Sequence, residues 1–108
     1  MPPQFRAGPK DAPAAIVRAI ETDAQALAVA MQAGGCKCAY IGAVIGKSEG
    51  YVSRMRSGRR PIPETLVPRL CLATGSNLIA QVRALRAALN GDPQSINAAL
   101  AARLREVA

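Results

Sequence analysis

The chain has 108 residues, 50% of them hydrophobic and 19% charged, which predicts one folded domain with a short tail and excludes a largely disordered chain. Its 14 Lys and Arg residues outnumber its 7 Asp and Glu residues, so we expect a polyanionic partner, either nucleic acid or an acidic membrane surface. No stretch approaches the roughly 18 apolar residues of a membrane span, and the N-terminus lacks the apolar core of a signal peptide. We therefore expect a cytoplasmic protein.

The composition predicts an all-α fold. Alanine, the best helix former, occurs 22 times, whereas the aromatic residues are only Phe5, Tyr40 and Tyr51. Residues 1–13 are expected to form a flexible N-terminal arm because they contain four of the eight prolines, namely Pro2, Pro3, Pro9 and Pro13.

The first helices are predicted from their capping signals. Residues 14–21 suit a short helical piece. Thr22 and Gln25 have capping-box spacing, which predicts a helix that begins there and runs to Ala33, where Gly34-Gly35 ends it.

Two short helices joined by a glycine turn are predicted in the middle of the chain. The first carries an apolar stripe and ends at Gly46, and Ser48 can cap the second. The second helix, Glu49–Ser57, turns only Val52 and Met55 towards the core, and Gly58 ends it. The stripe of the first helix consists of Cys38, Ile41, Val44 and Ile45.

Two further helices complete the predicted domain over residues 14–90. One spans about Leu66 to Thr74, with Thr65 as its N-cap and Gly75 at its end. The next begins at Asn77 and carries on one face Leu78, Val82, Leu85 and Leu89. Residues 91–108 are expected to form a C-terminal helical extension capped by Ser95, with an apolar stripe of Ile96, Leu100, Leu104 and Val107.

A short helix that is poor in core residues and polar on its outer face suits the major groove of DNA, where side chains near its N-terminus reach base edges. From this pattern we expect the base-reading residues to be Glu49, Gly50, Ser53 and Arg54. The stretch from Lys37 to Arg60 holds six basic residues and one acidic residue, a concentration that favours phosphate binding. The expected phosphate-binding residues are Lys37, Lys47, Ser48, Tyr51, Arg56, Ser57, Arg59 and Arg60.

These motifs resemble the helix-turn-helix domain of the phage lambda repressor and Cro family. The resemblance covers about residues 22–89 and is sharpest at Ile41–Ser48 and Val52–Pro61, with the family's small residue, turn glycine and buried valine matched by Gly42, Gly46 and Val52. Two positions depart from the usual pattern, because Gly42 replaces an alanine and Cys38 stands where a phosphate-contacting glutamine often occurs. The resemblance implies a five-helix domain that binds an operator in double-stranded DNA and regulates transcription, as a phage-type or prophage repressor associated with the nucleoid.

Several other functions are disfavoured. The stretch Gly42–Ser48 has three residues between its glycines where a phosphate-binding P-loop needs four, and no strand precedes it. Cys36, Cys38 and Cys71 supply only three soft ligands in a chain without histidine, so no metal site is expected. A redox-sensing thiol stays open, since Lys37 and a helix start can lower a cysteine pKa. No paired acid and nucleophile indicates an enzyme, and no cofactor or small-molecule ligand is expected.

The main alternative function is a protein-interaction module, such as an antitoxin or anti-activator, whose basic face binds an acidic partner. RNA binding is the second alternative, although two isolated tyrosines do not form a stacking platform for single strands. We also expect a symmetric homodimer, because one reading helix covers too few base pairs for specificity. Residues 93–108 are the expected contact, with residues 77–89 as the alternative that the resemblance implies and folding back onto the domain as a third possibility.

Overall fold

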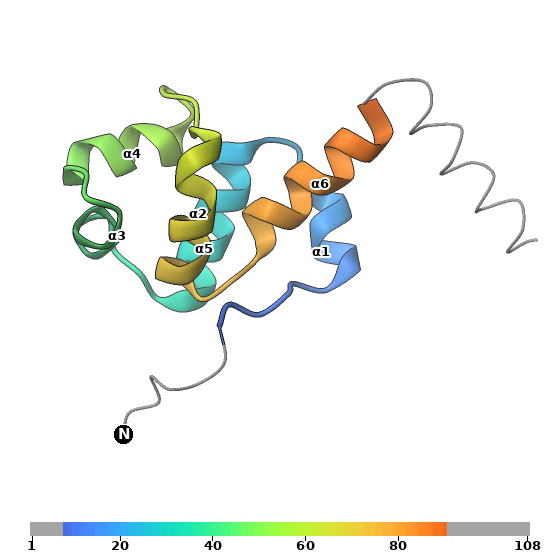
Figure 1. Ribbon diagram of the computed structural model, residues 1–108, viewed down its shortest axis with the longest axis horizontal. Helices are drawn as coiled ribbons and strands as arrows, with labels where there is room; N and C mark the ends of the chain where they lie inside the picture. The colour runs from blue at the N-terminus through green and yellow to red at the C-terminus, as the bar shows by residue number, and fades with distance from the viewer. Residues whose placement is uncertain (1–7, 91–108) are drawn as a thin grey trace, which may run out of the picture.

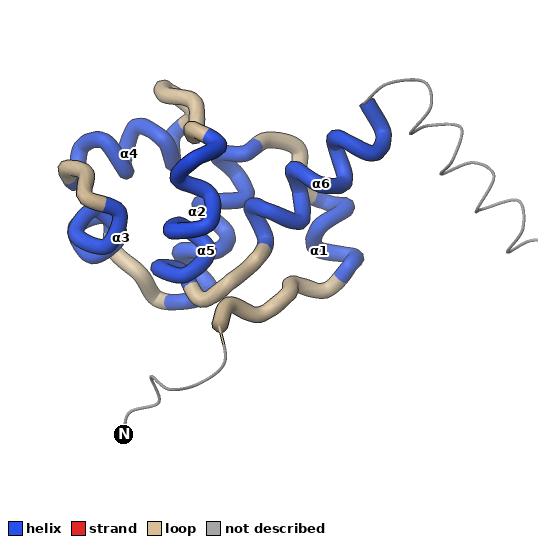
Figure 2. The backbone as a smooth tube through the Cα atoms, in the orientation of Figure 1, coloured by secondary structure: helices blue, strands red, loops and turns tan. Residues whose placement is uncertain are grey.

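Six α-helices and one 3₁₀ turn make up residues 8–90, the part of the chain that the computed structural model describes (Figures 1 and 2). Within these residues there is no strand, only an isolated bridge between Lys10 and Ser76, so the predicted all-α class is confirmed. The elements are α1 (Ala14–Ala19), α2 (Asp23–Gly34), α3 (Cys38–Ile45), α4 (Glu49–Ser57), the 3₁₀ turn η2 (Glu64–Leu66), α5 (Val67–Thr74) and α6 (Leu78–Asn90).

The core lies around α2, which packs against α4, α5 and α6, while α3 packs against α4 and α5. The largest fully buried side chains are Leu27, Met31, Ile41, Ile45, Val52, Met55, Leu70, Leu78 and Ile79. Every helix from α2 to α6 contributes at least one of them, so no one of these five helices can bury its apolar face alone. Figure 1 places α3 and α4 at one end of this body, and α1 with the end of α6 at the other.

An ion-pair cluster joins the start of α2 to α6. The carboxylate of Asp23 accepts hydrogen bonds from Arg83 at 3.0 Å and from Arg86 at 2.8 Å. Arg83 also donates to the carbonyl oxygen of Ile62, which fixes the loop between α4 and η2. Because Asp23 stands in the first turn of α2, its charge also interacts favourably with the helix dipole.

The expected flexible arm over residues 1–13 is wrong for its last part. The N–H of Lys10 donates to the carbonyl oxygen of Gly75, and its own carbonyl oxygen accepts from the N–H of Asn77. Ala12 exchanges two hydrogen bonds with the amide of Gln81 on α6. These partners are more than 60 residues away in sequence, so a composition rich in proline gave no sign of them. Residues 1–7 lie outside the described part.

Three expected details of the helices are also wrong. Thr65 does not cap α5, because it lies inside η2 and α5 begins at Val67 without a side-chain cap. Val44 and Leu89, expected in apolar stripes, are 42% and 58% exposed. The other stripe residues of these two helices are at least partly buried, so each helix buries a narrower face than the pattern indicated. The expected helix after Ser95 falls outside the described residues.

Among residues 8–90, no single helix is both long enough and apolar enough to cross a membrane. Only α2 and α3 taken together reach that length and hydropathy, and they are bent by 107° at the connection between them.

Candidate nucleic-acid interface

The connection between α3 and α4 is short and tightly packed. Gly46 ends α3 with φ of +75°, a left-handed conformation that a glycine adopts without strain. The N–H of Lys47 then donates to the carbonyl oxygen of Gly42 at 2.9 Å. A Cβ atom added at Gly42 would stand 2.5 Å from the carbonyl oxygen of Lys47, so only glycine fits where α3 meets this connection. The predicted roles of Gly42 and Gly46 are confirmed.

The start of α4 is fixed by a side-chain cap. The hydroxyl oxygen of Ser48 accepts a hydrogen bond from the N–H of Tyr51 at 3.1 Å, as its position before Glu49 predicts. Val52 and Met55 are fully buried and attach α4 to the core. The helix is therefore held by one edge and by its capped end, and its opposite face is left to solvent.

The four expected base-reading residues share that outer face, because Glu49 and Ser53, and likewise Gly50 and Arg54, are four residues apart in α4. Glu49, Gly50 and Arg54 are exposed, and Ser53 is half-buried. The Nη1 atom of Arg54 lies 3.2 Å from where a Cβ would stand at Gly50. The guanidinium group thus lies back along the helix over Gly50, towards the N-terminus of α4.

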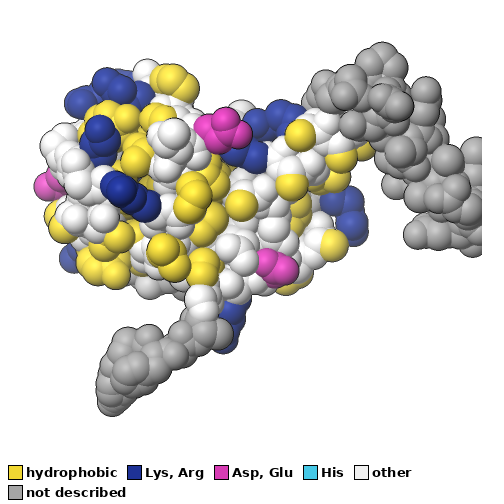
Figure 3. Space-filling view, in the orientation of Figure 1, with side chains coloured by type: hydrophobic (Ala, Val, Ile, Leu, Met, Phe, Trp, Pro, Cys, Tyr) yellow, Lys and Arg dark blue, Asp and Glu magenta, His cyan; other side chains and the backbone are white. Residues whose placement is uncertain are grey.

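Basic side chains border this face at both ends of α4. Lys47 precedes the helix, and Arg59 and Arg60 follow it, all exposed. Figure 3 shows Lys and Arg side chains at this end of the molecule. In the described part of the chain, the ion pairs within 4 Å involve only Asp23 with Arg83 and Arg86, so none of the basic residues from Lys37 to Arg60 is neutralised by an acid.

Tyr51 connects two of these cations. The Lys47 Nζ atom lies 5.1 Å from the centroid of the Tyr51 ring, and the Arg60 Cζ atom lies 4.3 Å from it. Both distances are typical of cation–π contacts. Tyr51 is half-buried, and the sequence gave no sign that its ring contacts cations from both ends of α4.

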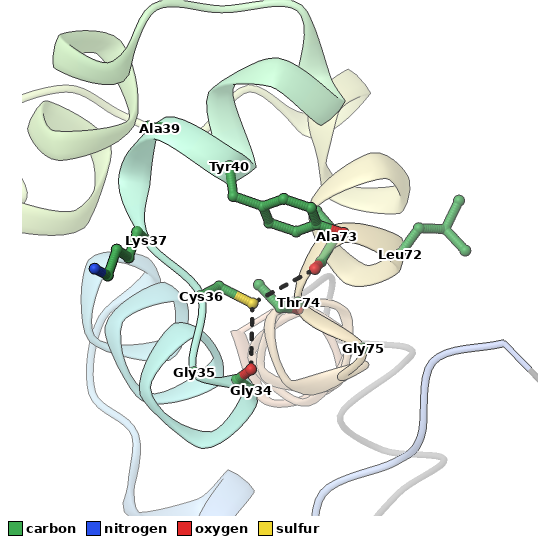
Figure 4. Close-up of a pocket in the computed structure, with 10 residues that line it drawn as sticks. All are labelled: Gly34, Gly35, Cys36, Lys37, Ala39, Tyr40, Leu72, Ala73, Thr74 and Gly75. Atoms are coloured by element: carbon green, nitrogen blue, oxygen red, sulfur yellow. Dashed lines mark hydrogen bonds between the residues drawn. The ribbon is translucent and has the colours of Figure 1, made fainter. Parts of the chain in front are cut away.

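The remaining expected phosphate ligands differ in their surroundings. Arg56 is exposed. The Ser57 hydroxyl donates to the carbonyl oxygen of Arg54 at 3.2 Å, so its proton is already used in a hydrogen bond within the helix. Lys37 is the N-cap residue of α3 and borders a groove between α3 and α5. Its side chain points away from Cys36 and Tyr40 (Figure 4).

The groove beside Lys37 was not predicted from the sequence. It has a volume of about 630 Å³, and two exposed apolar side chains, Tyr40 at 54% and Leu72 at 64%, stand at it (Figure 4). Neither Tyr40 nor Leu72 belongs to a predicted apolar stripe, so the sequence pattern did not bring them together.

The cysteines are separate, free thiols. Cys38 and Cys71 are buried, and the half-buried Cys36 thiol points towards the carbonyl oxygens of Gly34 and Ala73, at 3.7 and 3.6 Å. Burial raises the pKa of Cys36, which is the opposite of the lowering that a redox-sensing thiol near Lys37 requires. Burial raises the pKa of Cys71 as well. Within residues 8–90, no group of three or more Cys, Asp and Glu side chains is placed to hold a metal ion.

No protein-family model, no curated protein and no solved structure matches the chain. The function is therefore inferred from the geometry of α3, α4 and the loop after α4.

Proposed function

We propose that the protein is a sequence-specific regulator that binds double-stranded DNA, with α3 and α4 as a helix-turn-helix unit and α4 as the reading helix. It is the kind of repressor that the resemblance to the lambda repressor and Cro family implies. The observation that carries the proposal is the position of α4. This helix is fixed to the core by Val52 and Met55, and its polar face is exposed between cations that form no ion pair with an acid of residues 8–90.

The dimensions and charges of this unit suit the major groove. An α-helix such as α4 is about 10–12 Å across with its side chains and can lie in a groove about 12 Å wide. Arg54, on the outer face, carries a planar guanidinium that can bind the two acceptors of a guanine edge. Lys47, Arg59 and Arg60 lie beyond the two ends of the helix, where the phosphates that border the groove would pass.

A basic face alone also suits an acidic protein partner, but binding to such a partner does not explain why α4 exposes a polar face between cations. We therefore retain that function as the alternative and design the experiment to separate the two. A symmetric dimer on a two-half-site operator remains part of the proposal, since one helix covers only a few base pairs.

The test is competition binding between duplexes of different sequence at increasing salt. We expect one duplex to be retained at a salt concentration that releases the others, because base contacts persist where phosphate contacts are screened. Arg59→Ala should weaken all duplexes alike and reduce the salt slope by about one. Arg18→Ala is the matched control, since Arg18 is exposed on α1 at the opposite end of the body (Figure 1). Equal release of every duplex at the same salt would reject sequence-specific binding.

A further inference from the structure

Tyr51 is contacted by basic side chains that come from both ends of α4. It is the third residue of the helix, and its ring is contacted by Lys47 from before α4 and by Arg60 from after it. The contacts join residues that are 13 positions apart in sequence and carry the same charge. Like charges repel each other, so an attractive contact is needed to keep both beside the same ring.

The ring supplies the attraction. The face of an aromatic ring is electron-rich and attracts both an ammonium and a guanidinium group. No carboxylate of the described chain lies within 4 Å of either cation, so no acid takes part.

The backbones that carry the two cations are fixed as well. The N–H of Lys47 is bonded to the carbonyl oxygen of Gly42, and the N–H of Arg60 is bonded at 3.1 Å to the carbonyl oxygen of Arg54. The backbone of each residue is therefore fixed by a hydrogen bond, and the charged end of each side chain is held by the Tyr51 ring. Long basic side chains normally lose rotamer freedom when they bind a ligand. In this protein, the contacts with Tyr51 already restrict the rotamers of Lys47 and Arg60 before a ligand binds.

We propose that Tyr51 is a positioning residue whose ring, and not its hydroxyl, holds Lys47 and Arg60 together to bind one phosphate group of the duplex. The inference rests on the proposed DNA-binding function and adds to it a defined anion site. A phosphate diester carries the charge and the two free oxygens that an ammonium and a guanidinium can share.

A salt titration of DNA affinity distinguishes the role of the Tyr51 ring from the role of the two charges. Because Lys47 and Arg60 share one phosphate, Lys47→Ala and Arg60→Ala should each reduce the salt slope by less than one, and the double variant should reduce it by about one. Tyr51→Leu keeps both charges, so the slope should stay unchanged while affinity falls roughly tenfold at every salt concentration, as expected when two long side chains must be ordered during binding. Tyr51→Phe keeps the ring and should bind within about twofold of the wild type.

The ring contacts are also measurable without DNA. The Lys47 Nζ and Arg60 Cζ atoms lie over the Tyr51 ring, so in the free protein the NMR resonances of the methylene groups next to them should be shifted upfield and should lose this shift in Tyr51→Leu. Shifted resonances in a protein that binds no duplex would reject the DNA-binding function and leave the ring geometry standing. Unshifted resonances in a protein that does bind would reject the positioning role.

Three binding outcomes overturn the inference. They are a Tyr51→Leu protein that binds like the wild type, one whose salt slope falls as if a charge were lost, and a Tyr51→Phe protein that binds as weakly as Tyr51→Leu. If Tyr51→Leu does not fold, Tyr51→Phe and Tyr51→Trp decide the question, since both keep an aromatic face. Binding retained in both supports the ring, and a tenfold loss in Tyr51→Phe assigns the role to the hydroxyl.

Discussion

Gly42 and Gly50 offer a paired test of the packing between α3 and α4. Both are helical glycines, but an added Cβ meets different atoms at the two positions. At Gly42 it would stand 2.5 Å from the carbonyl oxygen of Lys47 and 3.2 Å from that of Ser48, which are backbone atoms of the connection to α4. At Gly50 its nearest neighbour is the tip of the Arg54 side chain, which can move aside.

These distances predict opposite effects of the same substitution. Overpacking against fixed atoms costs about 1–3 kcal/mol, and the backbone contact at Gly42 belongs at the upper end of that range. Alanine gains up to about 1 kcal/mol over glycine inside a helix, so the net loss for Gly42→Ala is about 2 kcal/mol. Gly50→Ala has no backbone clash and should stabilise the fold by up to about 1 kcal/mol.

The assay is urea unfolding followed by circular dichroism, with thermal unfolding beside it. A loss of 2 kcal/mol in a chain of this size should lower the Tm by roughly 8–16 °C for Gly42→Ala, whereas Gly50→Ala should raise it. A Gly42→Ala protein as stable as the wild type, or equal destabilisation of the two variants, would contradict the backbone clash at Gly42.

Other predictions concern the helix cap, the ion pairs, the thiols and the dimer. Ser48→Ala removes the cap of α4 and should cost about 1 kcal/mol in urea unfolding, whereas an unchanged midpoint would contradict the capping role. Asp23→Asn should lower stability by about 1 kcal/mol or less, because its two ion pairs are partly exposed, and a larger loss at high salt than at low salt would be the wrong result. The raised pKa of Cys36 predicts slower alkylation near neutral pH in the folded protein than in urea, and Cys36→Ser should keep full DNA affinity in the presence of a chelator. Faster alkylation in the folded state, or stoichiometric zinc in the purified protein, would overturn this. Truncation after Gly91 tests the dimer by sedimentation. A folded monomer supports a contact through the last residues, an unchanged dimer moves the contact to α6, and a full-length protein that is monomeric on its operator rejects the symmetric model.

The features predicted correctly from the sequence are local ones. The hydroxyl cap at Ser48, the glycine that ends α3 at Gly46 and the burial of Val52 each depend on residues within one or two helical turns. Such short-range hydrogen bonds and spacings are encoded directly in the order of residues. They were sufficient to identify α4 and its exposed face.

The features that were missed depend on contacts between distant segments. The hydrogen bonds of Lys10 to the loop before α6, and the contact of Arg60 with Tyr51, have no local signal in the sequence. The exposure of Val44 likewise depends on which face of α3 its neighbours cover. Periodicity shows that a helix has an apolar face, but the width of the face that is buried is decided by the packing of the other helices.

The central claim is that α4 reads DNA sequence, and selection from a random pool of duplexes tests it most directly when the wild type and Arg54→Ala are compared in parallel. We expect the wild type to enrich a motif with two related half-sites about 34 Å apart. Arg54→Ala should recover the same motif with the preference relaxed at one base pair in each half-site, and its affinity should fall by about 1–3 kcal/mol. Failure of the wild type to enrich any motif, or recovery of an identical motif with equal affinity by Arg54→Ala, would contradict the assignment of α4 as the reading helix.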